Sequence, residues 1–385
     1  MKWLHVLSSI DPRYGGPIEG VRNLGGHLTM LGHTVEVVTL DDPSEPFLTE
    51  FPLRVHALGP SIGSYRYCRH LVPWLKLHAR EFDAVIINGI WQFSSFGAAR
   101  ALRGTNIPYY VFLHGMLDPW FKRTYPFKHL KKWLYWPWGE YRVLRDARAV
   151  LFTCEEERRL ARQSFWLYTA KEKVVGYGIR LPPQENALVR ERFLMAHPEL
   201  RGRRVLLFLG RVHPKKGCDL LINAFARVAH IDESIFLVIG GPDSTGWLPE
   251  LQSLACKLGV ADRIIWTGML SGDMKWGAFY CSEAFILPSH QENFGIAVAE
   301  AMACKLPVLI SNKINIWREI EADQAGLVDD DTIDGTERTL RRWLSMSPDA
   351  RKAMGHRASQ CFLNRFTVDA MATSLVEFMA ELVNE

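Results

Sequence analysis

The stretch EAFILPSHQENFGIAVAE, residues 283–300, begins with a short apolar run, continues through a polar loop and ends in a series of small apolar residues. An apolar run of this length is typical of a buried strand, and the alanine-rich run after Gly295 predicts a helix. A buried strand followed at once by a helix is the repeating unit of parallel α/β sheets. The stretch also places two carboxylates close together in sequence, with Glu292 in the predicted loop and Glu300 in the second turn of the predicted helix.

The same alternation of apolar runs and helix-length amphipathic stretches continues along the chain. Strands are predicted in the first half at 3–10, 34–40, 54–58, 84–90, 109–115 and 149–154, and in the second half at 204–210, 235–241, 263–268, 284–289 and 307–311. Two successive sets of strands indicate an α/β fold with two Rossmann-like, doubly wound parallel-sheet domains. We place the first domain at residues 1–178 and the second at residues 179–364, with the glycine- and proline-rich segment 174–184 as the linker.

Composition narrows the class of protein. The chain has 385 residues, of which 48% are hydrophobic, which suits two sizeable cores and excludes a fibrous or disordered protein. Its seven cysteines are scattered without a C-x-x-C pair, as expected for reduced thiols in a cytoplasmic protein. No segment offers about 18 uncharged apolar residues, so neither a signal peptide nor a membrane span is expected. A net charge of +4 is too small to indicate nucleic-acid binding.

Ligands of doubly wound sheets bind beyond the carboxyl ends of the strands, and two loops at such ends contain suggestive residues. After the first strand, Gly15 and Gly16 allow close backbone approach to a phosphate or sugar, although an ordinary strand-to-helix turn would use the same residues. The loop GRVHPKKG, 210–217, contains Arg211 and Lys216, whose planar fork and compact point charge suit a diphosphate. A solvated basic loop is the alternative for this segment.

The loop and helix of residues 290–300 add acidic and backbone groups to the prediction. A helix N-terminus with Asn293 as its cap favours a phosphate near Phe294, Gly295 and Ile296. Glu292 accepts hydrogen bonds and therefore suits sugar hydroxyls, and Glu300 suits a ribose diol. Because Glu300 belongs to a strongly apolar helix, its carboxylate needs a partner. Together these residues predict a ligand with a base, a ribose, a diphosphate and a sugar.

A nicotinamide-dependent dehydrogenase is a minor alternative. Asp41 and Asp42 follow the second strand, where a ribose-binding acid would lie. The dinucleotide fingerprint, however, would need a central glycine at position 17, which is proline.

Four motifs, ordered along nearly the whole chain, resemble the retaining glycosyltransferases of family 4, or group 1, which have the GT-B fold. They are Gly15–Pro17, the HGMLDPW stretch with His114, the loop with Arg211 and Lys216, and the pair Glu292-x7-Glu300. The resemblance implies two facing domains with a nucleoside-diphosphate sugar in the cleft between them. It further implies that Glu300 binds the ribose, that Arg211 and Lys216 hold the diphosphate, and that Glu292 contacts the sugar, with His114 facing the reacting centre.

The resemblance also implies a final helix at about 365–385 that packs back on the first domain. The chain departs from the family pattern at Lys305, where glycine is usual, which calls the end of the preceding helix into question.

The reaction implied is transfer of a hexose from a UDP- or GDP-linked sugar to a saccharide or lipid-linked saccharide acceptor, in the synthesis of a cell-surface polysaccharide. No metal and no other cofactor is expected, since no suitable loop contains a D-x-D pair. Two alternatives stay open: a sugar-nucleotide 2-epimerase of the same fold, which needs no acceptor, and a nucleotide-sugar-binding protein without catalytic activity.

The segment 120–148 contains eight lysines and arginines, interleaved with aromatic residues, against Glu140 and Asp146. Such a stretch suits peripheral contact with an anionic membrane on its cytoplasmic face, or an anionic acceptor. A core helix pair with solvated lysines is an equal alternative. Single-stranded RNA is the least favoured partner, because no RNA-binding motif accompanies the charge.

Overall fold

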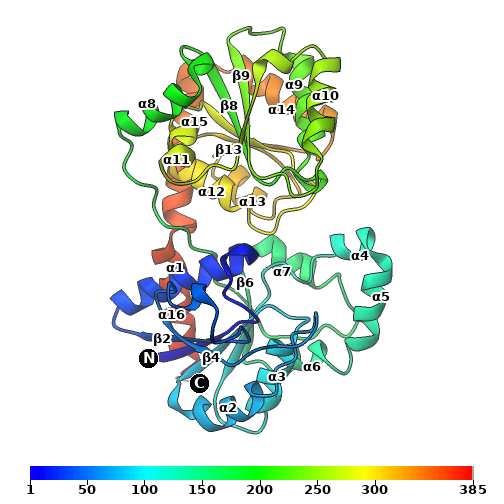
Figure 1. The fold of residues 1–385 in the computed structure, drawn as a ribbon, viewed down its shortest axis with the longest axis vertical. Helices are drawn as coiled ribbons and strands as arrows, with labels where there is room; N and C mark the ends of the chain where they lie inside the picture. Colours follow the sequence, from blue (N-terminus) through cyan, green and yellow to red (C-terminus); the bar gives the residue numbers. More distant parts are fainter. Residues whose placement is uncertain (384–385) are drawn as a thin grey trace. The chain divides into compact units, whose positions relative to one another are not determined.

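The computed structural model describes residues 1–383, which divide into two compact units (Figure 1). The first unit comprises Met1–Arg180 and the C-terminal segment from Thr367, and the second comprises Leu181–Phe366. Each unit is built on one sheet whose strands are all parallel. The predicted α/β class, with two doubly wound parallel sheets, is therefore confirmed. Residues 384 and 385, the end of the predicted final helix, lie outside the described residues.

The first unit has a seven-stranded sheet in the order β3-β2-β1-β4-β5-β6-β7. Its strands are β1 (Lys2–Val6), β2 (Thr34–Thr39), β3 (Arg54–Ala57), β4 (Ala84–Asn88), β5 (Tyr109–Phe112), β6 (Ala149–Phe152) and β7 (Glu172–Val174). Its helices are α1 (Gly16–Met30), α2 (Leu71–His78), α3 (Phe93–Leu102), α4 (Trp120–Thr124), α5 (Pro126–Tyr135), α6 (Glu140–Arg145), α7 (Glu155–Ala161) and α16 (Val368–Val383).

Both faces of this sheet are buried, which explains why its strands have nearly continuous apolar sequences. In β1, Leu4 and Val6 point into one core and Trp3 points into the other. The core around Trp3 also contains Leu24 of α1 and Leu375 of α16, so these two helices cover the same face of the sheet (Figure 1).

The second unit has a six-stranded sheet in the order β10-β9-β8-β11-β12-β13. Its strands are β8 (Arg204–Leu209), β9 (Ile235–Gly240), β10 (Ile264–Gly268), β11 (Ala284–Leu287), β12 (Val308–Ser311) and β13 (Gly326–Asp329). Its helices are α8 (Ala187–Ala196), α9 (Cys218–Val228), α10 (Leu248–Lys257), α11 (Gly272–Tyr280), α12 (Ile296–Ala303), α13 (Trp317–Ala322), α14 (Ile333–Ser345) and α15 (Pro348–Arg365).

Every predicted strand is present, but most end one or two residues earlier than predicted, because the last residues of each run turn into the following loop. Two strands were not predicted. β7 is a three-residue edge strand without a buried residue, and β13 is an edge strand that begins at Gly326. Neither has the long apolar run that identifies an interior strand.

Lys305 preserves the usual end of helix α12 despite replacing glycine. Its φ is 62°, in the left-handed region. Its N–H donates to the carbonyl of Met302, and the N–H of Leu306 donates to that of Ala301, both at 3.0 Å. These two hydrogen bonds form the Schellman motif, so the helix ends in the usual way. The lysine adopts a left-handed backbone conformation, which is less favourable for it than for glycine.

Gly217 brings the loop after β8 into contact with the loop after β11. Its φ is 67°, and a Cβ atom at this position would collide with the carbonyl oxygen of Pro288. Beside this contact, the N–H of His290 donates to the carbonyl of Lys215 at 2.9 Å. The fold therefore holds two loops from distant parts of the sequence in backbone contact.

We predict that Gly217→Ala destabilises the second unit far more than Gly202→Ala does. Gly202 has a similar φ of 70°, but a methyl group there would have no heavy atom within 4 Å, so both variants share the backbone cost and only Gly217→Ala adds the collision. The added loss should be about 1–3 kcal/mol, measured by urea unfolding. Equal losses in the two variants would mean that the loops do not depend on this contact.

Candidate functional site

Lys216 and Glu292 form an ion pair between the two loops that Gly217 holds together. Their side chains are only 15% and 22% exposed. Burial, with the positive charges of Lys215 and Arg211 nearby, lowers the pKa of Lys216. An opposite charge in direct contact, such as the Glu292 carboxylate, favours the charged form of the lysine. The sequence-predicted phosphate-binding lysine and sugar-binding glutamate are thus direct partners in this structure.

The backbone of Glu292 is fixed as firmly as its side chain. Its N–H donates to the carbonyl of Lys313 at 3.0 Å, and its carbonyl accepts from the N–H of Asn315 at 3.1 Å. The loop after β11 is therefore tied to the residues that follow β12, and Glu292 is presented by a rigid segment.

Glu300 pairs with Lys275 of α11, whose Nζ lies 2.7 Å from Oε1 of the glutamate. The Glu300 side chain is 13% exposed, and burial raises the pKa of its carboxyl group, while Lys275 acts against that shift. Lys275 also lies 4.3 Å from the ring centroid of Trp276. The ion pair with Lys275 provides the partner that the sequence analysis expects for Glu300. Lys275 itself was not predicted, because no motif in its own segment identifies it.

Helix α12 begins differently from the prediction. Its N-cap is Gly295, with φ 83°, and not Asn293, whose Oδ1 instead accepts from the side chain of Asn315 at 3.4 Å. A left-handed glycine gives the chain the sharp turn into the helix that an asparagine cap would not. Phe294 is buried and packs edge-on against Phe366. At the start of the helix, the groups suited to bind an anion are therefore the backbone N–H groups from Gly295 to Ile296 and not these two side chains.

Arg211 lies directly after Gly210 in the loop after β8, and its side chain is exposed. Within residues 1–383 its guanidinium takes part in no ion pair. It is close enough to Lys216 and His213 to lower the pKa of both groups by charge repulsion. This arrangement leaves a free cationic fork next to the buried ammonium of Lys216.

His114 follows β5 in the first unit and takes a left-handed φ of 50°. Its Nε2 lies 3.2 Å from Oδ1 of Asn88, and Nδ2 of Asn88 lies 3.2 Å from Nδ1 of the buried His5. Burial lowers the pKa of His114 to about 3, so the imidazole is neutral at ordinary pH. The adjacent Gly115 N–H donates to the buried carboxylate of Glu157 at 2.5 Å, which fixes the turn.

Gly15 and Gly16 form the turn from β1 into α1. Gly15, with φ 75° and ψ −130°, is the N-cap of the helix, and Gly16 is its first residue. No atom lies within 4 Å of a Cβ at Gly15, so its backbone conformation and not crowding requires glycine. In the first unit, these glycines and His114 both follow the carboxyl ends of strands.

The structure argues against the dehydrogenase alternative, because the two acidic residues that follow β2 already have partners within the protein. Asp41 is buried and accepts hydrogen bonds from the N–H of Ile10 at 2.8 Å, from Thr39 at 2.7 Å and from Arg66 at 2.8 Å. Asp42 bonds to Ser44 in its own turn. Both carboxylates are therefore used to build loops, and neither is free to bind a ribose.

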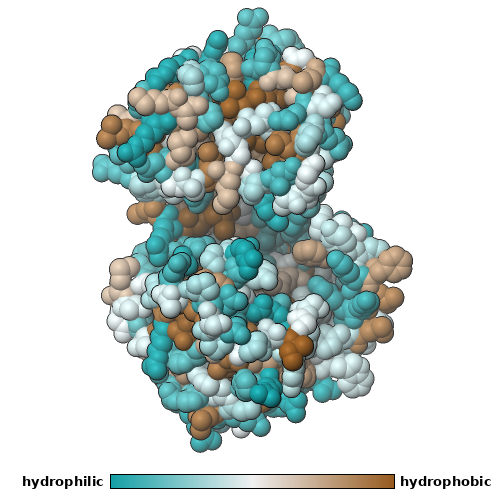
Figure 2. Space-filling model, in the orientation of Figure 1, coloured by the Kyte–Doolittle hydropathy of each residue, from teal (hydrophilic) through white to brown (hydrophobic). Residues whose placement is uncertain are grey.

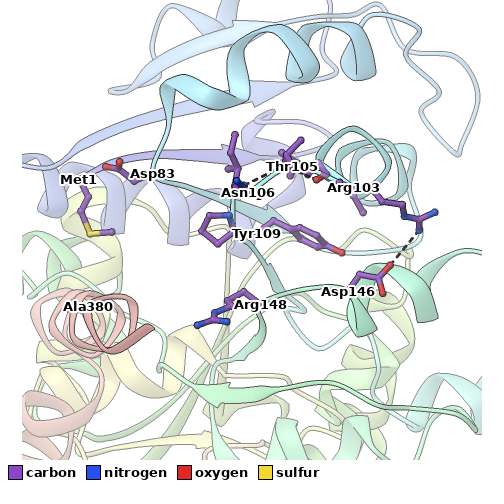
Figure 3. A pocket seen from close by; sticks show the side chains of 14 residues that line it. Met1, Asp83, Arg103, Thr105, Asn106, Tyr109, Asp146, Arg148 and Ala380 are labelled. Atoms are coloured by element: carbon purple, nitrogen blue, oxygen red, sulfur yellow. Dashed lines mark hydrogen bonds and ion pairs between the residues drawn. The ribbon is translucent and has the colours of Figure 1, made fainter. Parts of the chain in front are cut away.

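A cavity of about 990 Å³ lies at the opposite, amino-terminal ends of β4, β5 and β6 (Figure 3). Arg103 and Asp146 pair there at 3.5 Å, beside Tyr109. Because ligands of doubly wound sheets bind at the other ends of the strands, this cavity lies away from the predicted chemistry.

The described residues contain neither a metal-ligand cluster nor a helix suited to span a membrane. Among residues 1–383, no three histidine, cysteine, aspartate or glutamate side chains are grouped as metal ligands would be. In the same range, no helix combines the length and apolar character needed to cross a bilayer.

Comparison with known families covers both units. The family described as Glycosyl transferase 4-like domain matches residues 15–178, and the family Glycosyl transferases group 1 matches residues 190–360. Among curated relatives, D-inositol 3-phosphate glycosyltransferase of Segniliparus rotundus is 32% identical over 62% of this chain and 53% of its own. The enzyme of the same name from Thermomonospora curvata is 31% identical over 50% of this chain and 47% of its own. The chain thus spans about half the length of the curated relatives it matches.

Solved structures with the same fold cover nearly the entire chain. The Anabaena protein HepE in complex with UDP and glucose has a TM-score of 0.76 and 18% identity, over 99% of this chain and 100% of its own. Sucrose-phosphate synthase from Thermosynechococcus elongatus has a TM-score of 0.77 and 18% identity, over 100% of this chain and 99% of its own. With both family models matched in order and this fold in both units, the chain belongs to the group 1 glycosyltransferases of the GT-B fold.

Proposed function

We propose that this protein transfers a hexose from a UDP- or GDP-linked sugar to a saccharide or lipid-linked saccharide, with retention of the anomeric configuration. The observation that carries the proposal is the pair of lysine–carboxylate contacts, Lys216–Glu292 and Lys275–Glu300, in the second unit. Family membership supports glycosyl transfer as the activity. The name of the curated relatives, D-inositol 3-phosphate glycosyltransferase, supports a polyol phosphate as a class of acceptor. The Anabaena protein HepE, which has the same fold and was solved with UDP-glucose, supports a nucleotide-sugar donor.

The donor diphosphate competes with Glu292 for Lys216. In the structure, Lys216 is neutralised by the glutamate, and Arg211 is free. A diphosphate brings charges that both cations and the backbone at the start of α12 are suited to bind. As Lys216 turns to the phosphate, Glu292 is released to accept hydrogen bonds from the sugar hydroxyls. Donor binding is therefore an exchange of counterions within one buried site.

The ribose binds at Glu300. Lys275 favours the ionised form of this buried carboxylate. An ionised carboxylate can accept hydrogen bonds from both hydroxyls of a vicinal diol. Because the contact involves only the nucleotide, it serves every donor that shares the same nucleotide. Glu292, in contrast, contacts the sugar and therefore discriminates between donors that have different sugars.

In the chemical step, the bond between the anomeric carbon and the diphosphate oxygen breaks, and negative charge grows on that oxygen. Arg211 and Lys216 stabilise it. The acceptor hydroxyl attacks on the same face, its oxygen bonds to the anomeric carbon, and its proton passes to the departing phosphate. His114, neutral at ordinary pH, contributes a hydrogen bond to the sugar and not a charge. No metal or other cofactor is assigned a role.

The two rival functions differ from this proposal in what they require. A 2-epimerase would convert the donor without an acceptor, so its signature is a changed sugar nucleotide when no acceptor is present. A protein without activity would not need Glu292, Glu300, Arg211 and Lys216, all four of which this chain contains.

We also propose that the protein acts at the cytoplasmic face of a membrane, where cell-surface polysaccharides are assembled, and that α5 is its contact. No residue of α5 is buried, and Phe127, Leu130 and Leu134 are 83%, 55% and 62% exposed. These three lie on one side of the helix by their spacing. Figure 2 shows hydrophobic residues on this part of the first unit, where Figure 1 places α4 and α5.

Cationic residues surround the apolar side of α5. Lys122, Arg123, Lys128 and Lys131 are exposed, and no acidic residue occurs between Asp118 and Glu140. Exposed apolar side chains flanked by cations are typical of helices that lie in the interface of an anionic bilayer. The core-helix alternative applies to the end of the segment, where Trp136, Val143 and Leu144 are buried.

We predict that Glu300→Gln and Glu292→Gln separate nucleotide binding from sugar binding. Glu300→Gln should weaken the free nucleoside diphosphate and the complete donor alike, whereas Glu292→Gln should spare the nucleoside diphosphate and lower transfer. A lost hydrogen bond to a charged group corresponds to about 1.5–3 kcal/mol, or roughly 10- to 150-fold. Calorimetry and initial rates measure both effects. Equal loss of nucleoside diphosphate affinity in the two variants would refute the proposed donor position.

The membrane contact predicts salt-sensitive binding to vesicles that contain acidic lipid. Phe127→Ser should weaken this binding about tenfold, because one large side chain no longer enters the apolar layer. Met30→Ser is the matched control, since Met30 is 77% exposed on α1. Sedimentation with liposomes gives the affinities. If binding did not depend on acidic lipid, or if the two substitutions had equal effects, α5 would be excluded as the membrane contact.

A further inference from the structure

His213 caps the turn in the loop that presents Arg211 and Lys216. Its Nδ1 accepts a hydrogen bond from the N–H of Lys215 at 3.0 Å, and it is the N-cap of the short 3-10 helix at Pro214–Lys216. Its backbone carbonyl accepts from the N–H of Lys216 at 2.8 Å. One residue therefore fixes the backbone of Lys215 with its ring and the backbone of Lys216 with its carbonyl.

The other contacts of this loop join it to neighbouring loops through the backbone. The N–H of Val212 donates to the carbonyl of Pro242 at 3.0 Å, and the carbonyl of Lys215 accepts from the N–H of His290 at 2.9 Å. Inside the turn, the imidazole supplies the side-chain acceptor. Serine, threonine, aspartate and asparagine are the usual caps, and their side chains do not titrate near neutral pH. A histidine cap differs, because a proton on Nδ1 removes the acceptor.

Three cations lie near the imidazole of His213. Burial lowers the pKa of the ring, and the charges of Arg211, Lys215 and Lys216 lower it further. These charges oppose the addition of a proton, so the ring is neutral at neutral pH. Because Nδ1 accepts the hydrogen bond from Lys215, the hydrogen of the neutral ring is on Nε2. The cap is therefore formed at neutral pH.

The elements beside His213 add further titratable groups, whose carboxylates are bonded elsewhere. These groups are Glu292 and His290 after β11, Asp243 after β9, and Cys218 at the start of α9. Glu292 pairs with Lys216, and His290 pairs with a carboxylate of its own. Asp243 accepts hydrogen bonds from N–H groups of its own loop. Within the described part of the chain, His213 takes part in no ion pair, so no carboxylate in direct contact offsets the repulsion from the cations.

We propose that His213 is a positioning residue for the donor diphosphate, whose neutral imidazole holds Arg211 and Lys216 in place and whose protonation releases them. The inference rests on the proposed function, in which these two cations bind the diphosphate. A protonated Nδ1 cannot accept from the N–H of Lys215, so the turn loses its cap in acid. Since the pKa of His213 is lowered, this loss occurs below about pH 6.5, the ordinary pKa of histidine. Donor binding therefore has an acid limit set by a residue that does not itself contact the donor.

The affinity for a sugar nucleotide, measured by calorimetry as a function of pH, tests the cap. The probes are UDP-glucose and GDP-mannose, whose diphosphates are esterified at both ends and do not titrate near neutral pH. Wild-type affinity should fall, by up to roughly tenfold per pH unit, as the pH drops below the pKa of the ring. His213→Asn keeps a cap that does not titrate, so it should match the wild type at neutral pH and lose the acid limit. His213→Ala should bind roughly tenfold more weakly at neutral pH, because the cap is absent.

His230→Asn is the matched control, because His230 is an exposed histidine of the second unit outside this loop, and it should leave the acid limit unchanged. A wild type that binds more tightly in acid would overturn the inference, since protonated His213 would then act as a further cation for the diphosphate. An acid limit that persists in His213→Asn, or wild-type affinity in His213→Ala, would overturn it as well. His213→Asn decides the question by itself where His213→Ala does not fold.

Hydrogen exchange of the Lys215 N–H separates this inference from the proposed function, because it needs no donor. It is measured by NMR on the full-length protein with isotope-labelled lysine, at one neutral pH. Exchange should be roughly tenfold faster in His213→Ala than in the wild type, and close to the wild-type rate in His213→Asn. If these rates are found and neither sugar nucleotide binds, the proposed function fails and the cap stands. If exchange is equal in all three proteins and a sugar nucleotide binds, the cap fails and the donor site stands.

Discussion

The ion pair between Lys216 and Glu292 is the interaction on which the proposed donor site depends. It joins the loop after β8 to the loop after β11, and both residues are largely buried. Removing one partner of a buried pair leaves an uncompensated charge, at a cost of about 3–5 kcal/mol. The backbone contact at Gly217 brings the two loops together, and the ion pair provides each buried charge with a counterion. A ligand that supplies a diphosphate and hydroxyls can replace each half of the pair without leaving a bare charge behind.

The protein stabilises its buried cations in two different ways. A desolvated cation without a partner is unfavourable. In the second unit, Lys216 and Lys275 pair with Glu292 and Glu300, the carboxylates that we propose as ligands of the sugar and the ribose. In the first unit, the faces of Trp91 and Phe121 lie close to Lys132, and ring quadrupoles stabilise a cation without competing for its hydrogen bonds. Both arrangements offset part of the cost of desolvating a cation.

Sequence periodicity predicted the architecture because interior parallel strands require apolar residues on both faces. It missed β7 and β13, which are edge strands with short or partly polar sequences. Candidate site residues next to strand ends could be proposed for the same reason, since topology places the carboxyl ends of neighbouring parallel strands together. Lys275 could not be proposed in this way, because it lies in a helix 25 residues earlier in the sequence and meets Glu300 only in the folded structure. The cap at Gly295 was missed because side-chain preference favoured Asn293, whereas the turn needs a positive φ.

The central claim is that the protein's own cations, Arg211 and Lys216, neutralise the leaving diphosphate. Steady-state transfer measured in excess EDTA tests it most directly, with the wild type beside Arg211→Ala and Lys216→Ala. We predict that the wild type stays active, and that each variant loses turnover by roughly 10²-fold or more, as expected when a group aimed at developing charge is removed. Wild-type turnover in both variants, or a complete loss in EDTA that magnesium or manganese restores, would contradict it.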